Sequence, residues 1–151
     1  WTEEQWDRMM EVNVKGCWNC AKAAVPYMKK QHYGKIINLA SDSFVSGVPG
    51  FIHYISSKGG VVGFTRGLAR ELGEYGIRVN TLAPGYTMTA ESIVQTQGRP
   101  GWAEAERDRQ APKERNELPE DLAGPAVFLA SEDSDFITAQ MLVVDAGVVC
   151  W

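Results

Sequence analysis

The chain has 151 residues and is 44% hydrophobic and 23% charged, with a formal net charge of -4 at pH 7. Its length and composition are those of one globular domain with a core of its own, and it contains no apolar run long enough to cross a membrane. Because acidic and basic residues are interspersed and the balance is acidic, no basic face is expected, and nucleic acid is disfavoured as a partner.

A long helix is predicted at the start of the chain, from about Glu3 to Lys30. Thr2 is a suitable N-cap, and Gln5 stands where the second partner of a capping box belongs. Pro26, inside this segment, is expected to disturb the last turns of the helix. Because Trp1 already leads into a helix, we expect the chain to be part of a larger fold.

Three short apolar segments are predicted as strands, and helices alternate with them. The strands comprise residues 35–40 (KIINLA), 78–82 (RVNTL) and 141–144 (MLVV), with helices over about 54–73 and from about 119 onward. The strands lack an alternation of apolar and polar residues, which favours parallel strands that helices cover on both faces. The sequence therefore predicts an α/β fold.

Two segments rich in glycine, proline and polar residues are expected to line a substrate site. They are residues 45–51 and residues 90–116, and the second includes Trp102. Polar segments of this length are often mobile covers of active sites, so we expect them to form the wall and lid of the site. The alternative is that they are surface loops without a role in binding.

Tyr54 and Lys58 form the motif Y-x-x-x-K within the second predicted helix. Residues four apart lie on one face of a helix, so the phenol and the ammonium group can face one site. A free tyrosine has a pKa of about 10, and a nearby cation is expected to lower that pKa by roughly 1–3. The pair then suits proton transfer beside a carbinol or carbonyl carbon. On its own the motif is weak, and an exposed pair on a helix is the simpler interpretation.

Two further segments bring reactive or loop-forming residues to the same edge of the predicted sheet. Ser41 follows the first strand directly, and Pro84 and Gly85 follow the second. The carboxyl ends of parallel strands meet at one edge, where ligands bind in open α/β folds. Because the helix that begins at Tyr54 leaves the same edge, coincidence is the poorer explanation.

Four motifs occur in order along the chain: N-V-K-G at 13–16, I-I-N-L-A-S ending at Ser41, Y-I-S-S-K at 54–58, and R-V-N-T-L-A-P-G-Y-T-M-T at 78–89. In order and spacing they resemble the short-chain dehydrogenase/reductase family. The resemblance implies a Rossmann-type parallel sheet flanked by helices, as the C-terminal half of a doubly wound fold. It also implies an enzyme that interconverts a secondary alcohol and a ketone by hydride transfer, with NAD or NADP as its cofactor.

The resemblance implies a role for each catalytic residue. Tyr54 is the general acid in reduction and the base in oxidation, and Lys58 lowers its pKa and holds the hydroxyls of the nicotinamide ribose. Ser41 hydrogen-bonds the substrate oxygen and stabilises its developing negative charge. Asn13 holds, through a distortion of its helix, a water that relays protons to Lys58.

The same resemblance implies which residues bind the cofactor. Thr89 and the backbone around Thr87 are expected to hold the nicotinamide carboxamide. The implied partners are a small alcohol or ketone and further copies of the chain in a homodimer or homotetramer, in the cytoplasm, with no metal. The cofactor-binding residues are Tyr54, Lys58, Pro84, Gly85, Thr87 and Thr89.

Two glycine-rich motifs of the family, T-G-x-x-x-G-x-G and N-N-A-G, do not occur in this sequence. The run Gly59–Gly63 is no substitute, because it lies inside a helix, where its glycines are expected to allow a neighbouring helix to approach closely. The family's D-G-G is replaced by Asp145-Ala146-Gly147. We therefore expect residues 1–151 to be the C-terminal part of one domain that alone binds the cofactor weakly or not at all and has negligible activity.

Alternatives to an enzyme remain. One is a non-catalytic oligomerisation fragment of such an enzyme, inactive alone. Another is a thiol or zinc module built on Cys17 and Cys20, although their C-x-x-C spacing has no second pair, and Cys150 with the two histidines makes an unconvincing ligand set. His53, directly before Tyr54, either touches substrate or packs within the loop.

Overall fold

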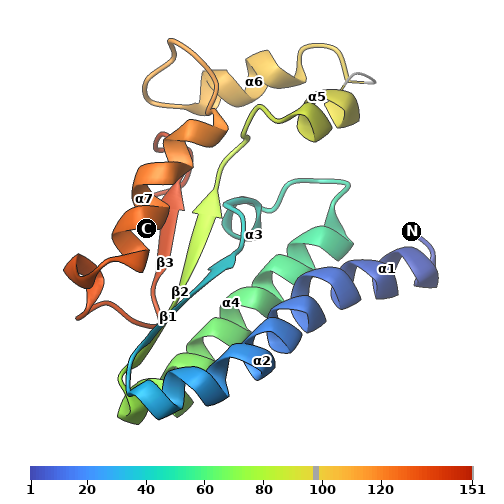
Figure 1. Cartoon of the computed structure of the whole chain (residues 1–151). Coiled ribbons are helices and arrows are strands. Elements are labelled where there is room, and N and C mark those ends of the chain that lie inside the picture. The colour runs from blue at the N-terminus through green and yellow to red at the C-terminus, as the bar shows by residue number, and fades with distance from the viewer. Residues whose placement is uncertain (97–98, 151) are drawn as a thin grey trace.

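The computed structural model describes residues 1–96 and 99–150, so residues 97 and 98 of the predicted lid lie outside the described part. A three-stranded sheet lies between helices (Figure 1). Its strands are β1 (Gly34–Leu39), β2 (Ile77–Pro84) and β3 (Met141–Val144). The helices are α1 (Glu3–Met10), the π-helix η1 (Glu11–Lys15), α2 (Gly16–Gln31), α3 (Ser43–Ser46), α4 (Ile52–Leu72), α5 (Ala90–Thr96), α6 (Trp102–Arg109) and α7 (Ala123–Ala130), with short 3-10 turns at Gly73–Tyr75, Pro119–Leu122 and Glu132–Ser134.

The three strands are parallel and follow the order β1-β2-β3. Pro84 pairs with Val144, so β2 extends beyond the predicted strand toward its carboxyl end. The backbone N–H of Asp42 donates to the carbonyl of Pro84 at 3.0 Å, which continues the pairing past the end of β1. The predicted strands are confirmed, and the chain leaves all of them at one edge of the sheet.

Helices cover both faces of the sheet. α4 packs on β1 and β2, and α2 packs on β1, whereas α7 lies against the same two strands from the opposite side (Figure 1). Two buried apolar clusters join α4 to the sheet, because the burial of these side chains removes apolar surface from water. The clusters are Ala69, Leu72, Ile77 and Val79, and Ala40, Val62 and Ala83. The predicted α/β class with a parallel sheet flanked by helices is confirmed.

The first helical segment is interrupted by a wide turn. The capping box predicted at its start is present: Gln5 N–H donates to Thr2 Oγ1 at 3.3 Å, and Thr2 N–H donates to Gln5 Oε1 at 3.0 Å. The segment then passes through η1 before α2 begins. The prediction that Pro26 disturbs the last turns is wrong, since α2 continues to Gln31. Pro26 has no N–H, so the carbonyl of Lys22, four residues earlier, loses its helical hydrogen-bond donor. Both residues are exposed, so a water can donate to that carbonyl instead.

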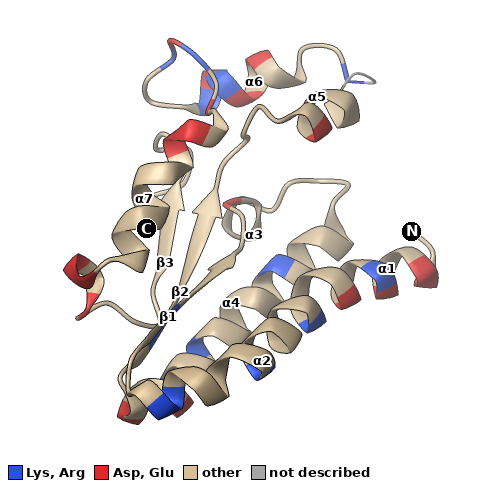
Figure 2. Cartoon of the chain, viewed as in Figure 1, with Lys and Arg blue, Asp and Glu red and all other residues tan. Residues whose placement is uncertain are grey.

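The segment predicted as a lid, residues 90–116, contains two short helices, α5 and α6, which lie beyond the carboxyl ends of the strands (Figure 1). Charged residues gather on α6 and on the loop after it (Figure 2), whereas α7 itself, Ala123–Ala130, contains none. Among the described helices, none combines the length and apolar character that crossing a membrane requires.

Candidate active site

The carboxyl edge of the sheet positions the Ser41 hydroxyl. The Ala40 N–H donates to the Leu82 carbonyl at 2.8 Å, so Ser41 stands immediately past the last pairing of β1 with β2. Its Oγ accepts hydrogen bonds from the Ser43 backbone N–H at 3.2 Å and from the Ser43 hydroxyl at 2.9 Å. Two donors therefore hold this oxygen, and the Ser41 hydroxyl itself donates to Asp42 Oδ1 at 3.4 Å.

Tyr54 lies in the first turn of α4, and its ring meets Phe51 edge-on at a centroid distance of 6.5 Å. Burial raises the pKa of its phenol, the neighbouring Ser41 hydroxyl opposes that shift, and the charge of Asp42 adds to it. The structure thus brings Tyr54 and Ser41 together, as the resemblance implied.

Lys58 lies one turn further along α4, with its Nζ 5.5 Å from the centroid of the Tyr54 ring. The ammonium group donates to the Leu39 carbonyl at 2.9 Å, and burial lowers its pKa. The expected depression of the Tyr54 pKa by Lys58 is not found in this structure. Burial of the ring sets the direction of the shift in the pKa of Tyr54, and the Lys58 ammonium group, which donates to the end of β1, is not among its causes.

Asn13 lies within η1, so the expected helix distortion is present. Its side-chain amide donates to the Ser57 hydroxyl at 2.8 Å, and that hydroxyl donates to the Tyr54 carbonyl at 2.7 Å. Close approach of the two helices is confirmed at Gly60, where a Cβ would lie 3.0 Å from the side chain of Val14. The structure therefore joins Asn13 to the helix that carries Tyr54 and Lys58.

The turn from Pro84 to Thr89 is held by Glu117, which the sequence analysis did not single out. Thr87 Oγ1 donates to Glu117 Oε1 at 2.7 Å, and Gly85 N–H donates to Glu117 Oε2 at 3.2 Å. Thr89 Oγ1 accepts from the Ser92 N–H at 3.0 Å and so holds the start of α5. Burial raises the pKa of Glu117. No sequence spacing signals a contact between residues that lie so far apart in the chain.

A second carboxyl group that the sequence analysis did not single out lies beside Ser41. Burial, followed by the negative charge of Asp145, raises the pKa of Asp42 to about 6. Asp145 is itself held by the N–H groups of Gly147 at 2.9 Å and Val149 at 2.8 Å. The edge of the sheet thus holds a proton-accepting group next to the candidate catalytic hydroxyl.

The geometry also bears on His53 and on the cysteines. The His53 ring lies 3.8 Å from the Trp1 ring, and its Nδ1 is buried without a partner among the described residues. This arrangement favours packing over substrate contact for His53. Cys17, Cys20 and Cys150 are free thiols, and no group of three or more potential metal ligands occurs within residues 1–96 and 99–150.

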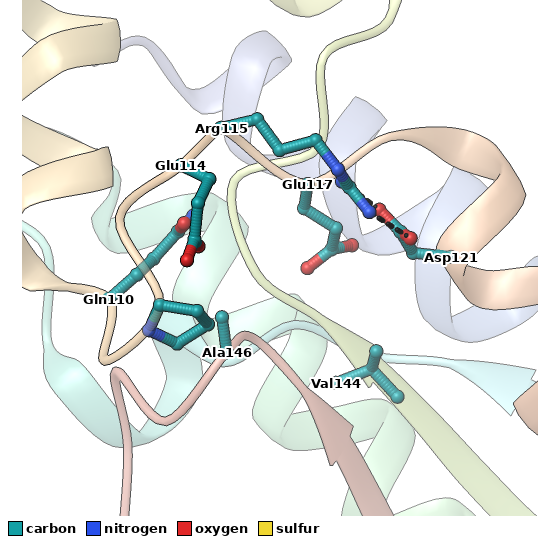
Figure 3. A pocket seen from close by; sticks show the side chains of 8 residues that line it. Gln110, Glu114, Arg115, Glu117, Asp121, Val144 and Ala146 are labelled. Atoms are coloured by element: carbon teal, nitrogen blue, oxygen red, sulfur yellow. Dashed lines mark hydrogen bonds and ion pairs between the residues drawn. The ribbon is translucent and has the colours of Figure 1, made fainter.

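Two pockets lie beside the group formed by Ser41, Tyr54 and Lys58, toward the predicted lid. One, of about 360 Å³, lies between the end of β3 and the loop before α7, where Arg115 holds Asp121 through two hydrogen bonds of 2.6 and 2.7 Å (Figure 3). The other, of about 340 Å³, is lined by the turn after β2, by α5 and by the start of α6, including Trp102. Neither pocket is lined by Tyr54 or Ser41, so each adjoins the cluster without containing it.

Comparison with known proteins places this arrangement in a family. A family model described as enoyl-(acyl carrier protein) reductase matches residues 1–149. The 3-oxoacyl-(acyl-carrier-protein) reductase of Thermotoga maritima is 40% identical over 147 residues, which are 97% of this chain and 58% of that relative. The chain thus spans a little over half the length of the curated relatives it matches.

Solved structures show the same arrangement. A gluconate 5-dehydrogenase from Burkholderia cenocepacia, in complex with NADP and tartrate, is 34% identical with a TM-score of 0.92 and covers 98% of this chain and 57% of its own. A 3-oxoacyl-(acyl-carrier protein) reductase from Brucella melitensis with bound NAD is 32% identical with a TM-score of 0.86 and covers 97% of this chain and 53% of its own. Family model, relatives and fold agree with the four sequence motifs, and the chain belongs to the short-chain dehydrogenase/reductase family of oxidoreductases.

Proposed function

We propose that this chain supplies the catalytic side chains of an oxidoreductase that interconverts a secondary alcohol and a ketone with NAD or NADP. The observation that supports the proposal most is that the Ser41 hydroxyl lies near enough to the Tyr54 phenol to lower its pKa, with Lys58 one helical turn away. Two hydroxyl groups and an ammonium group then meet at the edge where open α/β sheets bind ligands.

The residues present fit the nicotinamide end of such a cofactor. The Lys58 ammonium group has three N–H donors, and the structure engages one of them with the Leu39 carbonyl at 2.9 Å. The others suit the neighbouring hydroxyls of a ribose. Thr87 and Thr89 lie in the turn that follows β2, on the same edge of the sheet, where the carboxamide would be held.

A nicotinamide cofactor supplies or accepts the hydride when bound. In the reducing direction Tyr54 gives its proton to the substrate oxygen, and Ser41 donates a hydrogen bond to that oxygen as negative charge develops on it. Lys58 stabilises the phenolate that remains. Asn13 and Ser57 hold the backbone of the first turn of α4, so the phenol keeps its position.

The test uses protein expressed from the complete reading frame that encodes this chain. Secondary alcohols are offered with NAD or NADP, and the appearance of reduced nicotinamide is followed by its absorbance. Tyr54→Phe should lower kcat/KM by about 100- to 10,000-fold, because it removes the only proton that the ring can transfer. Turnover that survives this substitution, or no turnover of any alcohol with either cofactor, contradicts the proposal.

Subunit association in a homodimer or homotetramer also belongs to this proposal. Large apolar side chains are exposed on two sides of the chain, at Trp6, Trp18 and Tyr27 on one and at Val127 and Phe136 on the other. Contact with further copies would remove these surfaces from water. A cytoplasmic setting stays a prediction.

A further inference from the structure

Arg99 lies against two aromatic rings, those of Phe51 and Trp102. Its guanidinium carbon lies 5.0 Å from the centroid of the Phe51 ring and 4.9 Å from that of Trp102. The two rings are 6.3 Å apart. A guanidinium group stacked on aromatic faces keeps its charge and loses much of its conformational freedom, so it can present donors in a fixed direction.

This cation and the Tyr54 ring are both neighbours of Phe51. Phe51 caps the start of α4 and meets the Tyr54 ring at 6.5 Å, so one aromatic ring separates Arg99 from Tyr54. A Cβ at Gly50 would lie 3.8 Å from Arg99 Nη2, which places the guanidinium group against the loop before α4. A molecule that extends past the Phe51 ring would meet the guanidinium group on one side and the phenol on the other.

Within residues 1–96 and 99–150, no carboxylate forms an ion pair with Arg99. Two of the other three arginines of the same segment are paired: Arg109 with Glu106 at 2.9 Å and Arg115 with Asp121 at 2.6 Å. Glu104 lines the same pocket as Arg99 but lies beyond ion-pair distance. The donors of Arg99 are thus open to a ligand.

The pocket beside Arg99 suits the carbon skeleton of such a ligand. It has a volume of about 340 Å³, and its walls include Tyr86, Met88, Ile93 and Trp102. Arg99 is the one cation among the described residues that line it. Apolar walls with a few placed polar or charged groups are typical of sites for small molecules, and Arg99 supplies the positive charge here.

We propose that Arg99 binds an oxyanion of the substrate, a carboxylate or a phosphate, while the carbon to be oxidised lies at Tyr54. The planar fork of a guanidinium group matches both anions through paired hydrogen bonds. This inference rests on the proposed function and adds the class of substrate: a secondary alcohol or ketone that carries an anionic group.

The experiment compares matched substrates in protein from the complete reading frame. One arm pairs hydroxy acids with their primary amides, and the other pairs phosphorylated secondary alcohols with their unphosphorylated parents. For each pair, the ratio of kcat/KM for the anionic and the neutral member is measured. The proteins are the unsubstituted enzyme, Arg99→Gln, Arg99→Lys, and Lys113→Gln as the control, because Lys113 is an exposed cation of the same segment that lines neither pocket.

We expect the unsubstituted enzyme to prefer the anionic substrate in one of the two comparisons. A preference among the hydroxy acids would identify the anion as a carboxylate, and a preference among the phosphorylated alcohols would identify it as a phosphate. Arg99→Gln should lower that preference about 10- to 100-fold, mainly through KM, because a charge-assisted hydrogen-bonded pair is lost. Arg99→Lys should restore part of it, and Lys113→Gln should leave it unchanged.

Three results would overturn the inference. In the first, neutral members are turned over as well as anionic ones in both arms. In the second, Arg99→Gln leaves the preference unchanged. In the third, Arg99→Gln lowers kcat/KM equally for both members of a pair. Arg99 would then have only a structural role, in packing against Phe51 and Trp102. Since each of these results includes turnover of an alcohol, each is distinct from a failure of the proposed function, in which no alcohol is turned over.

Discussion

The side-chain amide of Asn13 donates a hydrogen bond of 2.8 Å to the hydroxyl of Ser57, which lies 44 residues further along the chain. Ser57 is 0% exposed and donates onward to the Tyr54 carbonyl at 2.7 Å. The π-helix is thereby linked, through Ser57, to the backbone of the first turn of α4. Ser57 directly precedes Lys58. Neither bond involves a reacting atom, yet together they fix the backbone that carries the phenol.

A double-mutant cycle between Asn13→Ala and Ser57→Ala measures this link. The coupling in the free energy of unfolding should be about 1 kcal/mol, as for a hydrogen bond between neutral side chains. Each single substitution should also lower kcat/KM. Asn19→Ala serves as the control, because Asn19 is an exposed residue of α2 and should have little effect. Additive effects of the two substitutions would contradict the link.

Ser41→Ala should lower kcat/KM by about 100- to 1,000-fold, the effect of removing one donor to a developing oxyanion. It should also move the pH dependence of alcohol oxidation to higher pH. The phenol must be deprotonated to act as the base, and the neighbouring Ser41 hydroxyl lowers the pKa of Tyr54. Ser46→Ala, on α3, is the matched control. A pH profile that Ser41→Ala leaves in place would contradict the predicted contact.

The raised pKa of Asp42 predicts an unusual dependence of stability on pH. The folded-state pKa of about 6 exceeds the ordinary value of 3.8, so the folded protein binds more protons than the unfolded chain between these values. The free energy of unfolding should therefore fall as the pH rises from about 4 to about 6.

Asp42→Asn removes this cost of an ionised carboxylate. At pH 7 it should raise the free energy of unfolding, by on the order of 1–2 kcal/mol, and at pH 4 its effect should be small. Urea unfolding at both values checks the prediction. Asp108→Asn, an exposed position of α6, is the control. Equal effects of Asp42→Asn at both pH values would show that its charge is not the cause.

Gly85 has no room for a side chain. A Cβ there would lie 2.9 Å from Asp145 Cβ, 3.0 Å from its Cα and 3.2 Å from Glu117 Oε2. Gly85→Ala should lower the free energy of unfolding by about 1–3 kcal/mol, since overpacking forces the backbone to shift. Gly67→Ala is the control: it has nothing within 4 Å, lies within α4 and should be stabilising by about 0.5–1 kcal/mol. Chemical unfolding that ranks the two variants in the opposite order would refute the crowding at Gly85.

Ala146 adopts a left-handed backbone, with a φ of 56°, in the turn after β3. That conformation costs an L-residue about 1–2 kcal/mol and costs glycine almost nothing. Ala146→Gly should therefore raise the melting temperature, by relieving strain at the position where the family carries glycine. Ala105→Gly, in the middle of α6, should lower it for the opposite reason. A lower melting temperature for Ala146→Gly would mean that the strain is relieved by other contacts.

Much of the architecture could be predicted because local patterns determine it. The segments that form β1, β2 and β3 lack an alternation of apolar and polar residues, which predicted parallel strands covered on both faces. Thr2 and Gln5 form the predicted capping box. The prediction for Pro26 was wrong because the effect of its missing N–H depends on whether the carbonyl of Lys22 is exposed to water. Exposure is decided by the tertiary structure.

The site was predicted less completely, for a physical reason. Tyr54, Lys58 and Ser41 follow short motifs, so spacing brings them to one edge. The roles of Glu117 and Asp42 arise from burial and from partners distant in sequence, which no local pattern encodes. The direction of the Tyr54 pKa shift was missed for the same reason, since the degree of burial decides it.

The wide turn Glu11–Lys15 has a geometric consequence for the helices on either side. An α-helix turns by about 100° per residue, so one additional residue in a single turn rotates everything after it by about that angle. Before the turn, α1 lies against α4, and after it α2 lies against β1. The additional residue thus changes which face of the helix points toward its neighbours. One continuous helical segment can then pack on α4 through α1 and on β1 through α2. Deleting a residue here would shift the phase of α2 as a whole, far from the place of the deletion.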